Sequence, residues 1–215
     1  ITPTRVFFVA PCLFDRRRLA LLHMMKPYEA KTFALDELDG LSAKQIEEHL
    51  KLYAGYVKNT NLLMEKIESH KQNSETMAIE LSELTRRMGF EWNGMRLHEV
   101  YFSQFEKGGV ESTKLQEALA TQYGSFDAWK NQVTATGLMR GIGWVLLIND
   151  KETGNLHTIW VSDHEYGHLA GTDVVFAMDV WEHAYTVDFA PTQRAAYIQA
   201  FWKNVNWNKV ETRYN

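Results

Sequence analysis

The sequence predicts an α+β fold, with an all-helical N-terminal half and a C-terminal half that combines strands with helices. Before residue 141, apolar residues recur at the three- and four-residue intervals of an amphipathic helix. After Gly141 the period shortens, because residues 144–148 and 156–161 form two strand-like apolar runs joined by a polar turn that contains Gly154. With 215 residues and a hydrophobic content of 45%, the chain is long enough to bury a substantial core.

The first helix has the clearest start signal. Ser42 and Gln45 have the spacing of a capping box, in which two side chains satisfy backbone N–H groups at the helix start. Apolar residues then continue at helical spacing to about His70. A second helix is expected over residues 75–88, with Gly89 as its C-cap.

Three further helices are expected before the strands begin. The third covers residues 92–105 and ends before a pair of glycines, and the fourth covers residues 114–122. Ser125 then has the position of an N-cap for a fifth helix that extends to about Arg140.

The rest of the chain completes a sheet and returns to helix. Residues 174–180 form a third strand, and residues 191–210 have apolar side chains at helical spacing. We therefore expect an N-terminal antiparallel helical hairpin domain over residues 26–109. A C-terminal α+β domain, with a three-stranded antiparallel sheet surrounded by helices, is expected over residues 110–215.

Residues 1–25 differ in composition from the rest of the chain. They contain four Arg and one Asp, and their apolar stretches lack a small-residue cleavage pattern. Three interpretations stay open: an organelle-type leader, a loose arm, or sequence upstream of a true start at Met24 or Met25. None of them affects the elements predicted after residue 25.

Composition excludes several classes of function. The single Cys12 rules out an internal disulfide framework and a Cys-rich zinc module, so a metal would rest on His and carboxylates. A net charge of −4 argues against broad nucleic-acid binding, which needs a basic surface. No apolar run is long enough to span a bilayer, so no membrane partner is expected.

The segment 179–185 carries the clearest sign of chemistry. It places Asp179 and His183 four residues apart, beside Trp181 and Glu182. One helical turn of separation can direct a carboxylate oxygen and an imidazole nitrogen toward one metal ion. The alternative is structural, with Asp179 as the N-cap of a helix and His183 in its first turn.

Two histidines in predicted helices are further ligand candidates. His49 has Tyr56 seven residues later on the same face, so the Tyr hydroxyl leans back toward whatever His49 holds. His98 lies in an aromatic-rich helix, in which Tyr101 and Phe102 would shield a neighbouring site. For both histidines, the alternative is a buried structural role.

Residues 164–168 match the zinc-hydrolase pattern H-E-x-x-H, with His164, Glu165 and His168 at the defining positions. That pattern binds zinc on a helix, where both His share a face. Strand-like residues precede the segment and Gly167 interrupts it, so a loop between strands is expected. A zinc hydrolase that uses this segment stays open as an alternative function.

The chain resembles the iron/manganese superoxide dismutase family from about residue 26 to residue 214. The matching segments surround the first two candidate histidines, residues 141–144 and residues 179–185, in order and with similar spacing. The resemblance implies one Fe or Mn ion per chain, with room for one solvent molecule. It also implies that the ligands are three imidazoles and one carboxylate, from His49, His98, Asp179 and His183.

The resemblance extends to the surroundings of the ion. Trp144 and Trp181 match family tryptophans that line the metal pocket. Residues 194–202 and 205–207 match the closing helix of the family, which would place Arg194 near the substrate channel.

The chain also departs from the common family pattern. Many members have a Gln that bonds the metal-bound solvent, either on a helix, where this chain has Gly94, or in the loop after the second strand, where it has His164. We expect His164 to take this role, as in some members, with a surface-loop His as the alternative. Tyr56 follows His49 by seven residues instead of the usual eight, which predicts a regular helix through both.

A symmetric homodimer or a homotetramer is the expected assembly. The usual family pair across the dimer interface is absent, because this chain has Leu52 and Tyr53 near the first position and Thr186 at the second. Glu182 remains a candidate to reach His183 of a partner chain.

The resemblance implies an oxidoreductase that converts two superoxide anions and two protons into dioxygen and hydrogen peroxide, as the ion cycles between M(III) and M(II). Tyr56, His164 and Arg194 are the candidate residues around the substrate. A non-catalytic relative that binds partners is a further alternative. The sequence leaves open the choice between Fe and Mn, and the cytoplasm is the default location, with an organelle or export left open by the basic arm.

Overall fold

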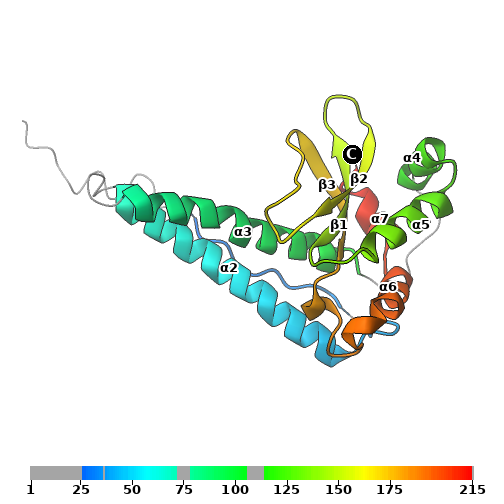
Figure 1. Cartoon of the computed structure of the whole chain (residues 1–215), viewed down its shortest axis with the longest axis horizontal. Helices are drawn as coiled ribbons and strands as arrows, with labels where there is room; N and C mark the ends of the chain where they lie inside the picture. The colour runs from blue at the N-terminus through cyan, green and yellow to red at the C-terminus, as the bar shows by residue number, and fades with distance from the viewer. Residues whose placement is uncertain (1–25, 36, 72–77, 106–113, 215) are drawn as a thin grey trace, which may run out of the picture.

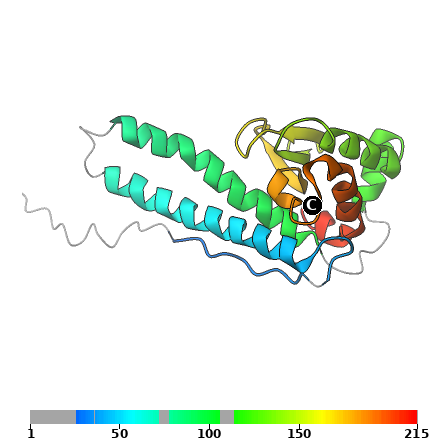
Figure 2. The ribbon, with the colours of Figure 1, turned by 60° about the horizontal axis from the view of Figure 1, so that its bottom comes forward.

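Two long antiparallel helices dominate the molecule. The computed structural model describes residues 26–35, 37–71, 78–105 and 114–214. Helices α2 (Ala43–Lys71) and α3 (Ala78–Ser103) form a hairpin that reaches well beyond the other described elements (Figure 1). The extended segment that begins at residue 26 runs beside α2 (Figure 2). The predicted helical hairpin is confirmed, and the predicted arm at residues 1–25 lies outside the described residues.

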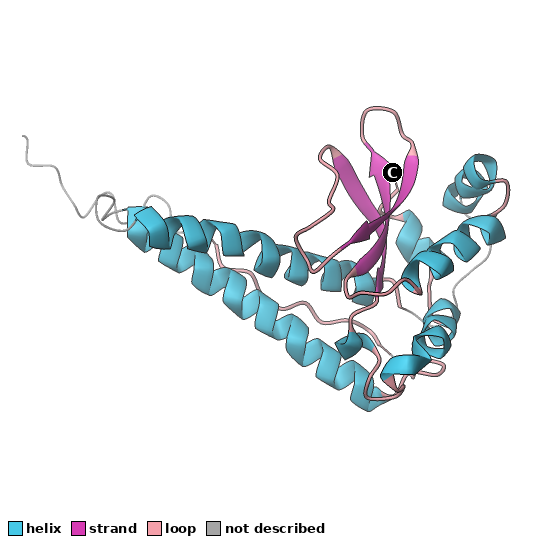
Figure 3. Cartoon of the chain, viewed as in Figure 1, coloured by secondary structure: helices cyan, strands magenta, loops and turns pink. Residues whose placement is uncertain are grey.

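A three-stranded antiparallel sheet stands at the end of the hairpin where α3 finishes (Figure 3). Its strands are β1 (Trp144–Asp150), β2 (Leu156–Val161) and β3 (Thr172–Asp179), in the order β2-β1-β3. The first five residues of the central strand β1 are all buried, since both faces of the sheet are covered. Trp144 pairs with Asp179 across β1 and β3, so the end of β3 lies beside the start of β1.

Short helices surround the sheet and complete the predicted α+β fold. They are α4 (Lys114–Tyr123), α5 (Phe126–Gly137), the 3-10 turns η1 (Glu182–Ala184) and η2 (Pro191–Gln193), α6 (Arg194–Lys203) and α7 (Trp207–Glu211). Their apolar faces join those of the hairpin and the sheet in one continuous core. The predicted domain boundary at residues 109 and 110 falls outside the described residues.

Helix α3 corrects the largest error in the sequence prediction. Gly89 was expected to end one helix before another began near Trp92, but α3 continues through both residues and ends at Ser103. Glycine inside a helix costs only about 1 kcal/mol relative to alanine. Packing of the following half of α3 against α2 and the sheet outweighs that cost.

The predicted capping box at the start of α2 is only half right. The Ser42 hydroxyl accepts a hydrogen bond from the backbone N–H of Gln45 at 3.0 Å, as expected. The Gln45 side chain, however, bonds the chain around His183, and the Ser42 N–H donates instead to Asp188. Tertiary contacts therefore replace the reciprocal half of the local motif.

Other predicted boundaries shift by a few residues. Ser125 is the N-cap of α5, as predicted, and accepts from the N–H of Ala128, but α5 ends at Gly137. The expected continuous helix over residues 191–210 is divided into η2, α6 and α7, because Asn206 starts a new helix as an N-cap. Within the described residues, no helix combines the length and apolar character needed to cross a membrane.

Candidate metal centre

Four side chains from four separate segments meet where the hairpin adjoins the sheet. His49 comes from α2, His98 from α3, Asp179 from the last position of β3, and His183 from the turn η1. Each offers one ligand atom, and the four atoms lie within 4.8 Å of one another. In the described part of the chain, this is the one group of three or more His, Cys, Asp or Glu arranged in this way.

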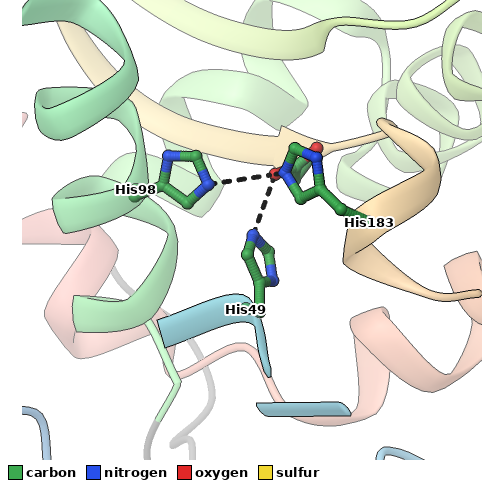
Figure 4. Close-up of side chains that lie close together, drawn as sticks. His49, His98 and His183 are labelled. Atoms are coloured by element: carbon green, nitrogen blue, oxygen red, sulfur yellow. Dashed lines mark hydrogen bonds and ion pairs between the residues drawn. The ribbon is translucent and has the colours of Figure 1, made fainter. Parts of the chain in front are cut away.

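The three imidazole rings point their Nε2 atoms at one carboxylate oxygen (Figure 4). Oδ2 of Asp179 lies 3.1 Å from Nε2 of His49, 3.3 Å from that of His183 and 3.8 Å from that of His98. The other carboxylate oxygen, Oδ1, accepts the backbone N–H of Trp181 at 2.8 Å. That bond orients the carboxyl group and leaves Oδ2 directed at the three rings.

The hydrogen bonds of the ligand candidates fit a bound cation. Nδ1 of His98 lies 2.6 Å from the carbonyl oxygen of Gly94, so this nitrogen carries the proton and donates. Nε2 of His98 therefore has a free lone pair, and it is buried with no hydrogen-bond partner. Nε2 of His183 is also buried without a hydrogen bond, because its 3.3 Å approach to Asp179 is not aligned for one. Buried nitrogens without partners are costly, and a metal ion would satisfy both.

Burial sets the charge states that metal binding needs. It lowers the pKa of both His49 and His98, so these imidazoles are neutral at pH 7 and can donate lone pairs. Burial alone would raise the pKa of Asp179, but the neighbouring rings of His183 and His49 lower it below its ordinary value. The group therefore combines three nitrogen donors with one carboxylate.

The secondary structure that carries Asp179 and His183 differs from both sequence interpretations. Asp179 ends a strand and His183 lies in a 3-10 turn, so a full helical turn does not separate them. The N-cap alternative is wrong, because Trp181 occupies the N-cap position of that turn. The predicted regular helix through His49 and Tyr56 is confirmed, since α2 is α-helical from residue 43 to residue 71.

A chain of hydrogen bonds runs from the sheet to the hairpin beside the four residues. Nε1 of Trp144 donates to Nδ1 of His164 at 2.9 Å, and Nε2 of His164 lies 2.8 Å from the Tyr56 hydroxyl. An indole N–H can only donate, so the neutral His164 ring carries its proton on Nε2 and donates to Tyr56. The Tyr56 hydroxyl is thereby left with its own proton to donate elsewhere.

Burial keeps the side chains of this hydrogen-bonded network neutral. It lowers the pKa of His164 to about 4, so the ring holds its donor and acceptor pattern at pH 7. It also raises the pKa of Tyr56 above the ordinary value, which keeps the phenol protonated. Trp181 stacks on His164 with ring centroids 5.0 Å apart, and Phe90 covers the same ring at 4.6 Å.

Gly94 explains how Tyr56 fits at a spacing of seven residues. A Cβ atom added at Gly94 would lie 2.6 Å from Cδ1 of Tyr56, a distance that side chains cannot tolerate. The Tyr56 ring therefore packs directly on the backbone of α3. A glutamine at position 94, as in many family members, would not fit beside this ring.

Aromatic side chains also pack against the four candidate ligands. The rings of Tyr101 and Phe102 lie 5.0 and 4.9 Å from the His49 ring. The Tyr101 hydroxyl bonds that of Tyr197, which in turn donates to the backbone carbonyl of Asp179 at 2.7 Å. Sequence reasoning placed Tyr197 only on an apolar helix face, since nothing local signals a bond to residue 179.

Two predicted residues lie further out. The Arg194 guanidinium donates to the carbonyls of Met139 and Gly141, both at 2.8 Å, and lies 3.3 Å from the Tyr185 hydroxyl. It therefore braces the loop before β1, and its place beside a substrate channel stays a prediction. The Glu182 side chain is exposed. A residue that contacts a partner chain in an oligomer would also be exposed in a single copy of the chain.

The H-E-x-x-H segment lies in the loop between β2 and β3, as predicted. Both ring nitrogens of His164 have partners in the Trp144–Tyr56 chain, and Nε2 of His168 bonds the His164 carbonyl oxygen at 2.9 Å. Gly167 adopts φ of 110°, which interrupts any helix. The two rings therefore do not share a helix face, as a zinc-hydrolase site requires.

Comparison with known proteins agrees with this geometry. Residues 111–213 match the sequence model of the iron/manganese superoxide dismutases, C-terminal domain. The superoxide dismutase [Fe] of Cupriavidus metallidurans is 35% identical over 197 residues, which cover 90% of this chain and 97% of that protein. This chain belongs to the iron/manganese superoxide dismutase family.

Other members of the family show similar likeness. The superoxide dismutase [Fe] of Aquifex pyrophilus is 34% identical over 184 residues, covering 82% of this chain and 85% of that protein. The superoxide dismutase [Fe] of Saccharolobus solfataricus is 32% identical over 167 residues, which cover 75% of this chain and 79% of that protein. The resemblance noted from the sequence motifs is thus confirmed over most of the chain.

Proposed function

We propose that the protein is a superoxide dismutase that uses one Fe or Mn ion held by His49, His98, Asp179 and His183. The observation that carries the proposal is the convergence of three imidazole Nε2 atoms on one carboxylate oxygen, two of them buried without partners. Membership of the iron/manganese superoxide dismutase family supports the same chemistry.

When bound, the ion supplies one-electron chemistry by alternating between the trivalent and divalent states. The residues around the ion position the substrate and supply protons to it. In the overall reaction, two superoxide anions and two protons give dioxygen and hydrogen peroxide, so the protein must deliver two protons in each cycle.

Tyr56, His164 and Trp144 form the hydrogen-bonded network that positions a proton donor. Trp144 fixes the tautomer of His164, and His164 donates to the Tyr56 hydroxyl. The phenol proton of Tyr56 is then free to point toward solvent or substrate at the ion. Trp181 and Phe90 cover the network, so its hydrogen bonds form away from bulk water.

The alternative functions receive less support. A zinc hydrolase would need His164 and His168 to ligate together, but both ring nitrogens of His164 and Nε2 of His168 bond other groups. A non-catalytic relative would be free to lose ligands, yet all four candidate positions keep metal-binding side chains. Iron is the metal to test first, because the relatives compared are named for it.

The proposal also covers the oligomeric assembly and the path by which the substrate reaches the metal centre. A homodimer or homotetramer would place the exposed Glu182 where it can reach His183 of a partner chain. Arg194 would act near the path of the anionic substrate, through the loop that it braces. A cytoplasmic location is the default expectation.

The test is reconstitution of the purified, metal-free chain with iron, manganese or zinc in parallel. Bound metal is measured by plasma mass spectrometry, and superoxide consumption is measured on the same samples. We expect close to one Fe or Mn per chain, with activity only in those samples. A chain that retains zinc alone, or that holds both iron and manganese without consuming superoxide with either, would refute the proposed function.

A further inference from the structure

The side-chain amide of Gln45 bonds a distant part of the backbone with both of its ends. Nε2 of Gln45 donates to the carbonyl oxygen of His183 at 2.7 Å, and Oε1 accepts the N–H of Val187 at 2.9 Å. Gln45 is fully buried. It lies on α2 one turn before His49, so its amide joins the helix of one candidate ligand to the turn that carries another.

Gln104 makes an equivalent pair of bonds on the other side of the centre. Its Nε2 donates to the carbonyl oxygen of Ala177 at 2.5 Å, and its Oε1 accepts the N–H of the same residue at 3.4 Å. Gln104 is also fully buried and directly follows α3, the helix of His98. Ala177 lies two residues before Asp179 on β3, so this amide joins the remaining two ligand-bearing segments.

Local structure alone holds His183 weakly. It lies in a 3-10 turn of three residues that has no side-chain cap. Its side chain is 19% exposed, whereas those of the other three candidate ligands are fully buried. The bond from Gln45 to its carbonyl oxygen is therefore the contact that ties its backbone to α2.

We propose that Gln45 and Gln104 are positioning residues for the metal centre, each clamping one C-terminal ligand segment against one ligand-bearing helix. The inference rests on the metal centre of the proposed function. A buried amide with two backbone partners resists displacement, because breaking either bond leaves unsatisfied polar groups without water. The clamps therefore keep the four ligand atoms close together when no ion is bound, and limit their separation when one is.

The chain provides a control residue with the same pattern of bonds. Gln122 on α4 bonds both the carbonyl oxygen and the N–H of Leu156, the first residue of β2. The bonds are of the same kind as in the two clamps, but Gln122 is exposed and neither of the segments that it joins carries a candidate ligand. Replacement of Gln122 thus tests the loss of such an amide at an exposed position away from the centre.

The experiment compares the iron-loaded full-length protein with three variants, Gln45→Met, Gln104→Met and Gln122→Met. Methionine has a similar length but cannot form the two bonds. A fourth variant, Gln45→Glu, keeps the acceptor for Val187 but loses the donor to His183. Two readouts are used: the rate at which iron passes to an excess of chelator, and the electron paramagnetic resonance spectrum of the ferric centre, which reports ligand geometry.

We expect iron release to be about tenfold faster in Gln45→Met and Gln104→Met, the usual scale for loss of a group that orients a ligand. Their ferric spectra should change, Gln45→Glu should lie between wild type and Gln45→Met, and Gln122→Met should match wild type in both readouts.

Three results would overturn the proposal. The first is wild-type release and spectra in all three clamp variants, Gln45→Met, Gln104→Met and Gln45→Glu. The second is equally fast release from Gln122→Met, which would indicate general softening of the fold. The third is loss of helical circular dichroism in the metal-free clamp variants, which would make the two glutamines folding residues. Failure of the proposed function is seen separately, as a wild-type chain that binds iron and manganese but consumes superoxide with neither.

Discussion

The two halves of α3 differ in burial although they belong to one continuous helix. In the outer half, residues 78–90, no side chain is buried, and Ile79 is 83% exposed. The inner half, residues 91–103, lies against α2 and the sheet and contains every buried residue of the helix. These are Glu91, Gly94, Met95, Leu97, His98, Glu99, Tyr101 and Phe102.

The difference shows where the chemistry of this hairpin can form. Outer-half charges such as Glu83 and Arg86 pair with each other in solvent, at 2.6 Å, and such exposed pairs add little. In the inner half, burial lowers the pKa of His98 and leaves its Nε2 without a partner other than an ion. Contact with the sheet therefore turns an ordinary helical segment into part of a metal centre.

The largest expected effect is at His98, in the inner half. His98→Ala removes one of the three imidazole nitrogens around Asp179, and we expect metal affinity to fall more than about 100-fold, beyond the loss typical of a group that only orients a ligand. Metal content and superoxide consumption should fall together. His70→Ala, at the far end of α2, is the control that should keep both. Full metal content in His98→Ala would contradict the assigned centre.

The next largest effect is expected in the hydrogen-bonded network of Trp144, His164 and Tyr56, which lies beside the inner half of α3. His164→Leu removes both the acceptor for Trp144 and the donor to Tyr56, and we expect kcat/KM for superoxide to fall by about tenfold or more. His164→Gln can still accept from Trp144 and donate to Tyr56, so it should keep most of the activity. Metal content measured on the same samples should stay near wild type. Equal losses in the two variants would argue against the assigned hydrogen-bond direction.

A pair of glycine substitutions compares packing on the two helices. Gly94→Ala in the inner half of α3 forces the Tyr56 ring to move, and we expect it to lower the free energy of unfolding by about 1–3 kcal/mol. An added Cβ at Gly55 on α2 meets nothing within 4 Å, so Gly55→Ala should raise that free energy by up to about 1 kcal/mol. Chemical denaturation of the metal-free protein measures both changes. The same sign for both would show that helix propensity outweighs the Tyr56 contact.

The smallest effect is expected in the outer half. Glu83→Gln removes the exposed ion pair with Arg86, and the free energy of unfolding should change by less than about 0.5 kcal/mol. Metal content and activity should equal those of wild type. A large loss of either would mean that this exposed ion pair takes part in the centre, and the contrast between the two halves would no longer hold.

Local signals in the sequence predicted much of the fold. The hydroxyls of Ser42 and Ser125 cap their helices as expected, because an N-cap depends only on residues a few positions away. The change of period after Gly141 located β1 and β2 within a residue or two, since strand alternation is also local. Gly89 misled the prediction, because the packing that carries α3 through it comes from distant segments.

The candidate site was predictable to a similar extent. Motif spacing and the family resemblance brought out all four candidate ligands, and helical periodicity placed Tyr56 on the face of His49. The clamp formed by Gln45 was hidden, because its spacing from Ser42 matched a local capping box that only half forms. The bond from Tyr197 to the carbonyl of Asp179 left no sequence signal, since it depends on a backbone atom.

By itself, the sequence determined most of the helical and strand segments, the metal-binding residue types and the regular helix that aligns Tyr56 with His49. Tertiary structure alone decided that four segments converge within 4.8 Å and which ring nitrogens remain free. It also decided which glutamines join the ligand-bearing segments. The physical reason is range: propensity, capping and periodicity act over a few residues, whereas burial and hydrogen-bond partners depend on segments more than a hundred residues apart.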